Sequence, residues 1–240
     1  MPKLADLHNH ALFGVDDGAR TKAITEEMLA ISYAEGVRVL CLTPHGDPMR
    51  FPYEREVALA RYEEIKQLCR ERYPDLTVYL GNEMFGYLDS VSTLVSGQFF
   101  PLGNSNVALV EFANDVDYRD MCNVLQSYRA AGYRPMLAHA ERCACLVHDV
   151  ARVDELAAMR VLIQLNTSAF RHTVLPSRTT RFVRSLLDGG MVTAISSDAH
   201  GVAQRTPHIL FAYTAVERRY GSKAAEKLFY ENPVRILQGG

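Results

Sequence analysis

Apolar residues form two kinds of pattern that alternate along the chain. Seven short runs are rich in apolar residues and have the length of a strand; they cover residues 3–8, 37–42, 76–80, 107–110, 135–138, 161–165 and 192–195. Runs that are apolar nearly throughout are typical of parallel strands covered on both faces. We therefore predict seven buried strands.

Between these runs, apolar residues recur at the i, i+4, i+7 spacing of an amphipathic helix. The clearest stripes begin at Ile24, Ala58, Met121 and Ile209. Shorter helices are predicted near residues 150–159 and 225–229. The second of these should end before Pro233, because a proline disfavours helical backbone at the residue that precedes it.

Alternating strands and helices predict a parallel sheet with right-handed crossovers. In a chain of 240 residues, of which 48% are hydrophobic, the economical closure is an α/β barrel of seven βα units, similar to a TIM barrel. No linker, low-complexity tract or internal repeat divides the sequence. The pattern therefore predicts a single domain over residues 1–240.

The charge balance excludes some functions without indicating a partner. The chain has 26 basic and 28 acidic residues and no basic run, so it lacks the electrostatic footprint of a nucleic-acid-binding protein. No apolar stretch approaches the ~20 residues of a membrane span, and the first residues lack the apolar segment of a signal peptide. The predicted location is the cytoplasm.

Side chains that can bind metal follow the C-terminal end of almost every predicted strand. They are His8, His10, Asp17, His45, Glu83, Glu111, His139, Asp198 and His200. In (β/α) barrels these strand ends form the active site, so the side chains should lie on one face. Each has a simpler explanation, such as a solvated strand end or a core histidine, but their coincidence at six strand ends favours a metal site. Nine candidates exceed the about four ligands of one zinc ion, which indicates two or three divalent ions.

Two local patterns refine this prediction. Pro44 cannot donate to a strand ladder, so the second strand should stop there and leave His45 in a loop. Asp16-Asp17-Gly18 has the composition of a turn in which Gly18 takes positive φ, so a ligand role for either aspartate stays open on this pattern alone.

Several motifs in chain order carry a resemblance to a known family. They are Asp6-Leu-His-Asn-His10, Val15-Asp-Asp-Gly18, Thr43-Pro-His45, Gly81-Asn-Glu83, Val110-Glu-Phe112, Ala138-His-Ala-Glu-Arg142, Gln164-Leu-Asn166 and Ser197-Asp-Ala-His200, with Arg205 and Leu228-Phe-Tyr-Glu-Asn-Pro233. The chain resembles the PHP (polymerase and histidinol phosphatase) metallophosphoesterases, and most of all the bacterial phosphotyrosine phosphatases of capsule and exopolysaccharide operons. The resemblance implies the PHP fold, a distorted (β/α)7 TIM-like barrel with a trinuclear metal site.

The resemblance also implies how the ligands are shared. His8, His10, Glu83 and Asp198 would hold one ion, Glu83 would bridge to a second held also by Glu111 and His139, and Asp17, His45 and His200 would hold the third. The family's metal is commonly manganese, with iron, zinc, cobalt or magnesium as alternatives. Asp6 would orient a ligand imidazole, and Arg142 and Arg205 would contact the phosphate. Gly46 departs from the pattern, since many relatives have a second histidine there.

The activity implied by the resemblance is hydrolysis of phosphotyrosine on proteins, with a metal-bridging hydroxide that attacks phosphorus. The expected partner is a bacterial tyrosine kinase with a tyrosine-rich tail, and the oligomeric state is left open. None of the five cysteines has an arginine six positions later, so the loop of cysteine-dependent phosphatases is absent. Cys143 and Cys145 are separated by one residue, which is short for paired zinc thiolates.

Three other functions stay open at this point. The chain could hydrolyse histidinol phosphate or another small phosphoester with the same metal site. It could be a non-catalytic PHP module that binds metal for stability or docks on a polymerase. It could also be an interaction protein for a tyrosine kinase, with residual activity.

Overall fold

The structure is a computed structural model, and it describes residues 1–171 and 177–240. The strands are β1 (Leu4–Asn9), β2 (Val37–Leu42), β3 (His45–Gly46), β4 (Thr77–Leu80), β5 (Glu83–Phe85), β6 (Val107–Glu111), β7 (Arg134–Leu137), β8 (Leu162–Asn166) and β9 (Ala194–Ser196). The helices are α1 (Lys22–Ala34), α2 (Arg55–Arg72), α3 (Val91–Val95), α4 (Tyr118–Ala130), α5 (Ala144–His148), α6 (Ala151–Ala158), α7 (Arg178–Asp188), α8 (Leu210–Tyr220), α9 (Ser222–Glu226) and α10 (Asn232–Leu237). Short 3-10 segments follow β7 at Ala140–Arg142 and β8 at Thr167–Phe170, and a π-helical segment occupies Lys227–Glu231.

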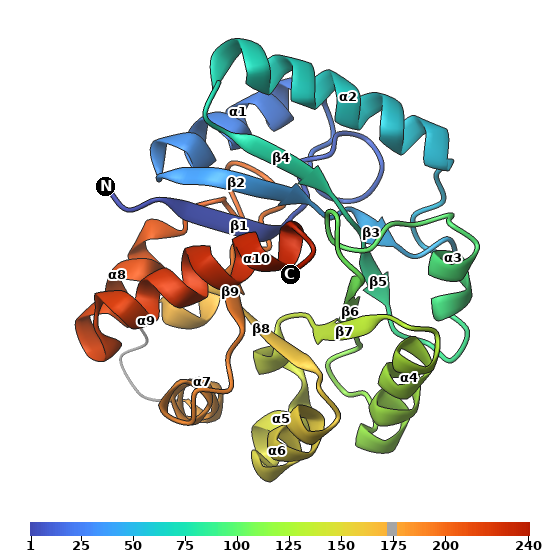
Figure 1. The fold of residues 1–240 in the computed structure, drawn as a ribbon, viewed down its shortest axis with the longest axis vertical. Helices are drawn as coiled ribbons and strands as arrows, with labels where there is room; N and C mark the ends of the chain where they lie inside the picture. Colours follow the sequence, from blue (N-terminus) through green and yellow to red (C-terminus); the bar gives the residue numbers. More distant parts are fainter. Residues whose placement is uncertain (172–176) are drawn as a thin grey trace.

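The strands form a curled parallel sheet with helices around its outside (Figure 1). One part has the order β1-β2-β4 and the other has the order β3-β5-β6-β7-β8-β9. Because β3 continues β2 and β5 continues β4, the described strands correspond to the seven that the sequence predicts. The ring closes where β9 meets β1, through a parallel bridge between Asn9 and Ala199. The distorted single-domain barrel is therefore confirmed.

The break at Pro44 is shorter than predicted. His45 does not lie in a loop but forms β3, which pairs with Glu83 of β5. Pro44 lacks only its own N–H, and its carbonyl still accepts a hydrogen bond from the backbone of Glu83 at 3.1 Å. The proline thus removes one donor from the ladder, and after two residues the strand resumes as β3, which pairs with β5, the continuation of β4.

The last helical stretch also differs from the prediction, because it continues through Pro233 instead of ending before it. Glu231 has helical φ and ψ of −61° and −52°, and Asn232 has −64° and −50°. The π-helical segment Lys227–Glu231 interrupts the regular α-helical hydrogen bonds, and Pro233 lies in the first turn of α10, where its missing N–H needs no partner. The pattern also did not predict α7, which buries only three residues, or the five-residue helices α3 and α5.

Apolar side chains pack on both sides of the strands. Leu40 of β2 belongs to a large cluster under the helices, whereas its neighbour Cys41 belongs to a smaller cluster on the other face. We call this second cluster the lower core; it comprises Ala5, Leu7, Val39, Cys41, Leu102, Val107, Leu109, Met136, Ala138, Leu162, Ala194, Ile236 and Leu237. Its last two members come from α10, which lies across the ring beside β1 (Figure 1). The C-terminal helix therefore plugs the barrel.

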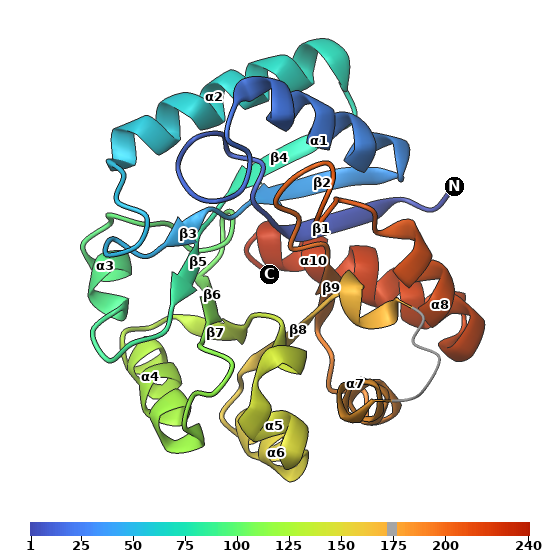
Figure 2. The same ribbon diagram turned by 180° about the vertical axis from the view of Figure 1, so that it is seen from behind.

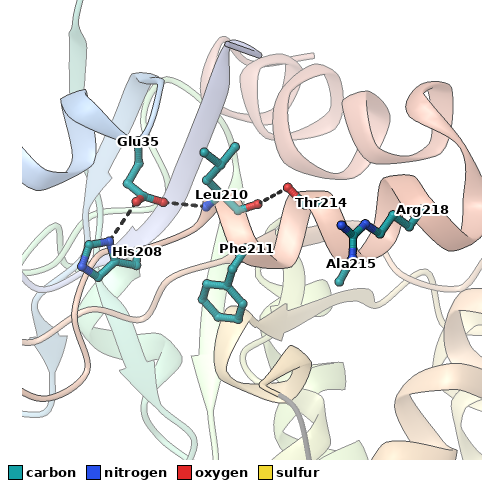
Figure 3. Close-up of a pocket in the computed structure, with 7 residues that line it drawn as sticks. All are labelled: Glu35, His208, Leu210, Phe211, Thr214, Ala215 and Arg218. Carbon is teal, nitrogen blue, oxygen red and sulfur yellow. Dashed lines mark hydrogen bonds and ion pairs between the residues drawn. The ribbon is translucent and has the colours of Figure 1, made fainter.

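Glu35 ties the helix that follows the last strand to α1. Its carboxylate accepts hydrogen bonds from the backbone N–H groups of Ile209 at 3.1 Å and Leu210 at 2.8 Å, and its Oε1 lies 2.9 Å from Nδ1 of His208 (Figure 3). A carboxylate is favourable at a helix N-terminus, where the first N–H groups lack partners. This cap fixes the end of the segment between β9 and α8.

No helix in the described ranges is long and apolar enough to cross a membrane.

Candidate metal centre

All nine predicted ligands meet at the C-terminal ends of the strands, at the end where the loops after β1 and β9 lie in front in Figure 2. They come from β1 and the loop after it (His8, His10, Asp17), β3 (His45), β5 (Glu83), β6 (Glu111), the end of β7 (His139) and the segment after β9 (Asp198, His200). Each has a side-chain nitrogen or oxygen within 3.6 Å of another member. Seven are buried, Glu111 is nearly so and Asp17 is exposed.

The carboxylate of Glu83 is the centre of this cluster, and it is fully buried. Its Oε1 lies 3.1 Å from Nε2 of His8 and 2.8 Å from Nε2 of His139. Its Oε2 lies 3.2 Å from Nε2 of His10 and 3.2 Å from Nδ1 of His45. One carboxylate group therefore faces four imidazoles, as a bridging ligand would.

Three sets of side-chain atoms lie within 4.8 Å of one another and could each share an ion: His8, His10, Glu83 and Asp198; His10, Asp17, His45 and His200; and His45, Glu83 and Glu111. The first set is the one implied by the resemblance. The second adds His10 to the expected set, and the third contains His45 where His139 was expected. His139 still lies close, with Nε2 3.6 Å from Oε2 of Glu111.

The hydrogen-bonding pattern of the cluster fits metal ligands. Within the described residues, buried His45 Nδ1, Glu83 Oε2, Glu111 Oε1 and His200 Nε2 have no hydrogen-bond partner. His45 Nδ1 and Glu111 Oε1 approach to 2.9 Å without the alignment of a hydrogen bond. Buried polar atoms without partners are destabilising, whereas convergent imidazole and carboxylate atoms suit a shared divalent cation. These residues therefore can hold metal ions.

Asp16 makes buried contacts that the sequence did not predict, since the sequence left open only whether it is a ligand. Its Oδ2 lies 2.8 Å from Nδ1 of His10 and accepts a hydrogen bond from the backbone N–H of His45 at 3.0 Å. Its Oδ1 accepts from the backbone of Gly18 at 2.9 Å. A carboxylate on the second nitrogen of a ligand imidazole fixes the tautomer and the ring orientation. The only signal in the sequence was its place beside Asp17.

The expectation that Asp6 orients an imidazole is wrong. Its carboxylate accepts hydrogen bonds from the backbone N–H of Ser197 at 2.9 Å, from the Ser197 hydroxyl at 2.5 Å and from the amide of Asn9 at 3.1 Å. In the irregular register of β1, Asp6 thus joins the first strand to the segment that carries Asp198. Asp6 positions a backbone segment and not a ring.

Two amides of β8, Gln164 and Asn166, form hydrogen bonds with residues of the metal centre. Gln164 Oε1 accepts a hydrogen bond from the backbone of His139 at 2.6 Å and lies 3.4 Å from Nδ1 of His8. Gln164 donates to Asn166 Oδ1 at 2.9 Å, and Asn166 donates to Asp198 Oδ2 at 2.7 Å. A chain of hydrogen bonds therefore connects three of the predicted ligands.

Both predicted phosphate-binding arginines lie against one ligand carboxylate. Arg142 Nη2 is 2.9 Å from Oδ2 of Asp198, and Arg205 Nη2 is 2.7 Å from Oδ1. The two guanidinium side chains are 36% and 40% exposed, so they stand at the boundary between the buried cluster and solvent. They are available to an anion that approaches the cluster.

Backbone strain is concentrated at the same residues. Among the described residues, four that are not glycine have positive φ, and three of them are His139 (33°), Asp198 (52°) and Arg205 (48°). Such conformations are unfavourable for residues other than glycine and persist where surrounding contacts impose them. The strain marks this end of the barrel as functional.

Two glycines next to the ligands leave no room for a side chain. A Cβ on Gly18 would collide with the carbonyl oxygen of His10, while the positive φ of this loop belongs to Gly14 at 65°. The expectation of positive φ at Gly18 is therefore wrong. A Cβ on Gly46 would stand 2.5 Å from Sδ of Met84, so Met84 occupies the space that the second histidine of many relatives would need.

Carboxylates raise the pKa of three imidazoles in the cluster. Burial lowers the pKa of His10, but the charge of Asp16 and the contacts with Asp16 and Glu83 together outweigh burial and raise the pKa to about 9. Burial likewise opposes protonation of His45 and His139, but their carboxylate neighbours bring the pKa to about 11 and about 10. For His200, burial and the charge of His10 lower the pKa to about 4.

The same contacts hold the carboxylates ionised. Burial raises the pKa of Glu83, but its interactions with His8 and other imidazoles lower it well below its usual range. The pKa of Asp198 is lowered in the same way. The nearby imidazoles of His200 and His45 lower the pKa of Asp17. Cations that bind to the cluster would therefore displace protons from its imidazoles.

Fold and site together define a class: a single-domain α/β barrel that can hold metal ions at the C-terminal end of its strands. The chain belongs to the CpsB/CapC family of capsular polysaccharide synthesis, whose model matches residues 4–238. This family is the branch that the sequence motifs indicated, so the resemblance is confirmed.

Individual relatives agree with this assignment over nearly the whole chain. The tyrosine-protein phosphatase CpsB of Streptococcus pneumoniae is 29% identical over 238 residues, which cover 98% of each chain. The tyrosine-protein phosphatase YwqE of Bacillus subtilis strain 168 is 26% identical over 221 residues, which cover 92% of this chain and 86% of YwqE. A solved structure from a study of YwqE and CpsB as metal-dependent tyrosine phosphatases has a TM-score of 0.87 at 24% identity, covering 98% of this chain and 94% of that one.

Proposed function

We propose that this chain is a metal-dependent protein-tyrosine phosphatase. The observation that carries the proposal is the convergence of nine histidine, aspartate and glutamate side chains, with Glu83 at their centre and two arginines at the edge. The named activity of the relatives CpsB and YwqE supports the same assignment.

The cluster would hold three divalent ions, with manganese as the proposed metal. The ligands are those predicted from the sequence: His8, His10, Asp17, His45, Glu83, Glu111, His139, Asp198 and His200. Four of these are carboxylates, which contribute −4 against roughly +6 from three divalent ions. The excess of positive charge favours binding of a phosphate dianion.

Bound divalent ions would supply Lewis acidity and lower the pKa of water, so that water can attack phosphorus at neutral pH. The chain itself orients the phosphate. Arg142 and Arg205 both lie within 2.9 Å of Asp198 and are partly exposed, so each can donate to a phosphoryl oxygen at the edge of the cluster. Gln164, Asn166 and Asp16 hold the ligands in place.

The leaving group favours tyrosine as the substrate residue. A phenol has a pKa of about 10, well below that of an alkyl alcohol, so the phenolate can leave with little help from a general acid. The natural substrate we propose is the phosphorylated tail of a bacterial tyrosine kinase in capsule or exopolysaccharide synthesis. A cytoplasmic location, where such a tail would be met, also remains a prediction.

Phosphate release from a phosphotyrosine peptide tests the proposal. The metal-stripped protein would be measured with and without added manganese, beside a phosphoserine peptide and histidinol phosphate. We expect manganese-dependent release mainly from phosphotyrosine. Release mainly from histidinol phosphate would keep the site and overturn the substrate, and no release with metal bound would show a non-catalytic module.

A further inference from the structure

One wall of the metal centre is aromatic, and neither metal binding nor the contacts of the two arginines involve it. The ring of Phe51 stacks on the ring of His45, with centroids 4.9 Å apart and an angle of 11° between the planes. Phe51 is half-buried and belongs to the segment between β3 and α2. An aromatic side chain therefore lies directly beside a predicted ligand.

A guanidinium and a second ring extend this wall toward solvent. The Cζ atom of Arg50 lies 5.3 Å from the centroid of Phe51 and 5.7 Å from that of Phe85. Phe85 is two residues after Glu83 on β5, so its side chain lies on the same face of the strand, one step nearer the C-terminal edge. Phe85 is also half-buried. We call Arg50, Phe51 and Phe85 the aromatic wall.

The turn that carries the wall is fixed by a buried carboxylate. Asp47 Oδ1 accepts hydrogen bonds from the backbone N–H of Met49 at 3.0 Å and of Arg50 at 3.3 Å, and its carbonyl accepts from Phe51 at 2.8 Å. Asp47 itself is buried. The aromatic wall is thus presented by a defined turn and a strand end, which limits the entropy lost when a ligand binds.

We propose that the aromatic wall is an aryl-binding subsite, which selects phosphate and phosphonate groups carried on an aromatic ring over those carried on an alkyl chain. The proposal rests on the function proposed above and adds what recognises the alcohol part of the ester. Metal ions and arginines recognise only the phosphoryl group, which all phosphomonoesters share. Half-buried rings beside the centre can contact a phenyl ring by offset or edge-to-face packing, and Arg50 can add a cation–π contact.

Binding of two non-hydrolysable ligands tests the subsite without turnover. Calorimetry on the manganese-loaded protein would compare phenylphosphonate with methylphosphonate, for the natural chain and for Phe51→Leu and Phe85→Leu. We expect each substitution to weaken phenylphosphonate binding roughly three- to tenfold, as expected for one aromatic contact, and to change methylphosphonate binding less than about twofold. The matched control is Tyr220→Leu, whose ring also lies near a guanidinium, 5.5 Å from Arg219, but on α8.

Two results would overturn the subsite. One is equal weakening of both ligands together with a lower bound-metal content in Phe51→Leu, with no effect of Phe85→Leu; Phe51 would then only support His45. The other is unchanged selectivity in both variants. Failure of the proposed function looks different, because it would appear as absent release from phosphotyrosine peptide by the natural chain, whatever the phosphonates show.

Discussion

The two ends of the barrel interior are built from the same strands and have opposite chemistry. At the N-terminal end, Leu7 and Leu109 pack into an apolar core that α10 closes. At the C-terminal end, His8 and Glu111 of the same strands lie in a cluster of buried charges. Moving along one strand by one or two residues therefore changes the environment from apolar to ionic. Residues that stabilise the fold and residues that can bind metal therefore lie at different positions of the same strands.

The difference between the ends is also one of conformational strain. His139, Asp198 and Arg205 have positive φ at the C-terminal end, whereas no residue of the lower core is among the described non-glycine residues with positive φ. Apolar packing stabilises the fold directly, whereas buried charges must be compensated by partners or cations. Substitutions at the two ends should consequently change different measured quantities.

The largest effect is expected on turnover at the C-terminal end. His139→Ala removes the imidazole that faces Glu83, and Asp198→Ala removes the carboxylate that faces both arginines. Each should lower the rate of phosphate release by more than roughly 100-fold, the largest effect usual for a residue that only orients a ligand. Steady-state release from a phosphotyrosine peptide measures this. Cys145→Ser is the matched control and should keep nearly full turnover; normal activity in either ligand variant would refute the site.

At the opposite end, Leu237→Ala should act on stability. Leu237 is fully buried in the lower core, and a buried leucine replaced by alanine loses about 2–5 kcal/mol of unfolding free energy. Denaturant unfolding measures the loss, with the exposed Val95→Ala as control. Turnover per folded molecule should be unchanged, so a selective loss of turnover at full stability would contradict the separation of the two ends.

Asp16→Ala tests a residue that holds a ligand without belonging to the predicted ligand set. Loss of its contact with His10 should weaken metal binding about 10–100-fold, the usual range for such partners. Metal titration of the stripped protein measures the change, and Asp154→Ala, an exposed position on α6, is the control. Unchanged affinity would mean that the loop alone orients the imidazole.

The pH dependence of metal binding gives the smallest effect. In metal-stripped protein at pH 7, His10, His45 and His139 should be protonated because their pKa values are about 9, 11 and 10, whereas His200, at about 4, should be neutral. Ligands bind metal as neutral imidazoles, so binding releases protons and strengthens as pH rises from 6 to 9. Calorimetry in buffers of different ionisation enthalpy counts the protons, and zero release would contradict these pKa values.

The same shifts predict how the stripped protein responds to base. A histidine whose pKa is raised in the folded state stabilises the fold fully below its unfolded value of about 6.5, and this stabilisation is lost as pH rises through the folded pKa. The stripped protein should therefore lose stability progressively between about pH 6.5 and 11. Thermal unfolding across this range, with metal-loaded protein as reference, measures the effect.

The sequence predicted the strands and all nine ligand candidates because both follow from position along one strand. Each apolar run marks a strand, and the polar residue at its end marks the face. Contacts between distant segments have no such signal. Asp6 accepts from Ser197 across 191 positions, and Asp16 reaches the backbone of His45 across 29. Their partners could be identified only once the fold had placed them together.

Local rules also failed where tertiary contacts outweighed them. Pro44 did interrupt the second strand, but strand pairing resumes at His45, which pairs with Glu83 of β5. Pro233 did not end the last helix, because Ile236 and Leu237 beyond it are needed to fill the lower core. In both places the burial of neighbouring residues decided the backbone, which a reading of single residues does not include.

The seam between β1 and β9 has a mechanical consequence. Backbone pairing there consists of one bridge between Asn9 and Ala199, with hydrogen bonds from Asp198 to His8 and from His10 to Ala199. The side chains of His8, His10 and Asp198 span the same seam, and with Glu83 they form one of the possible ion sites. An ion bound there would link the first and last strands through its ligands, so loading with metal would resist forced opening of the barrel between these strands.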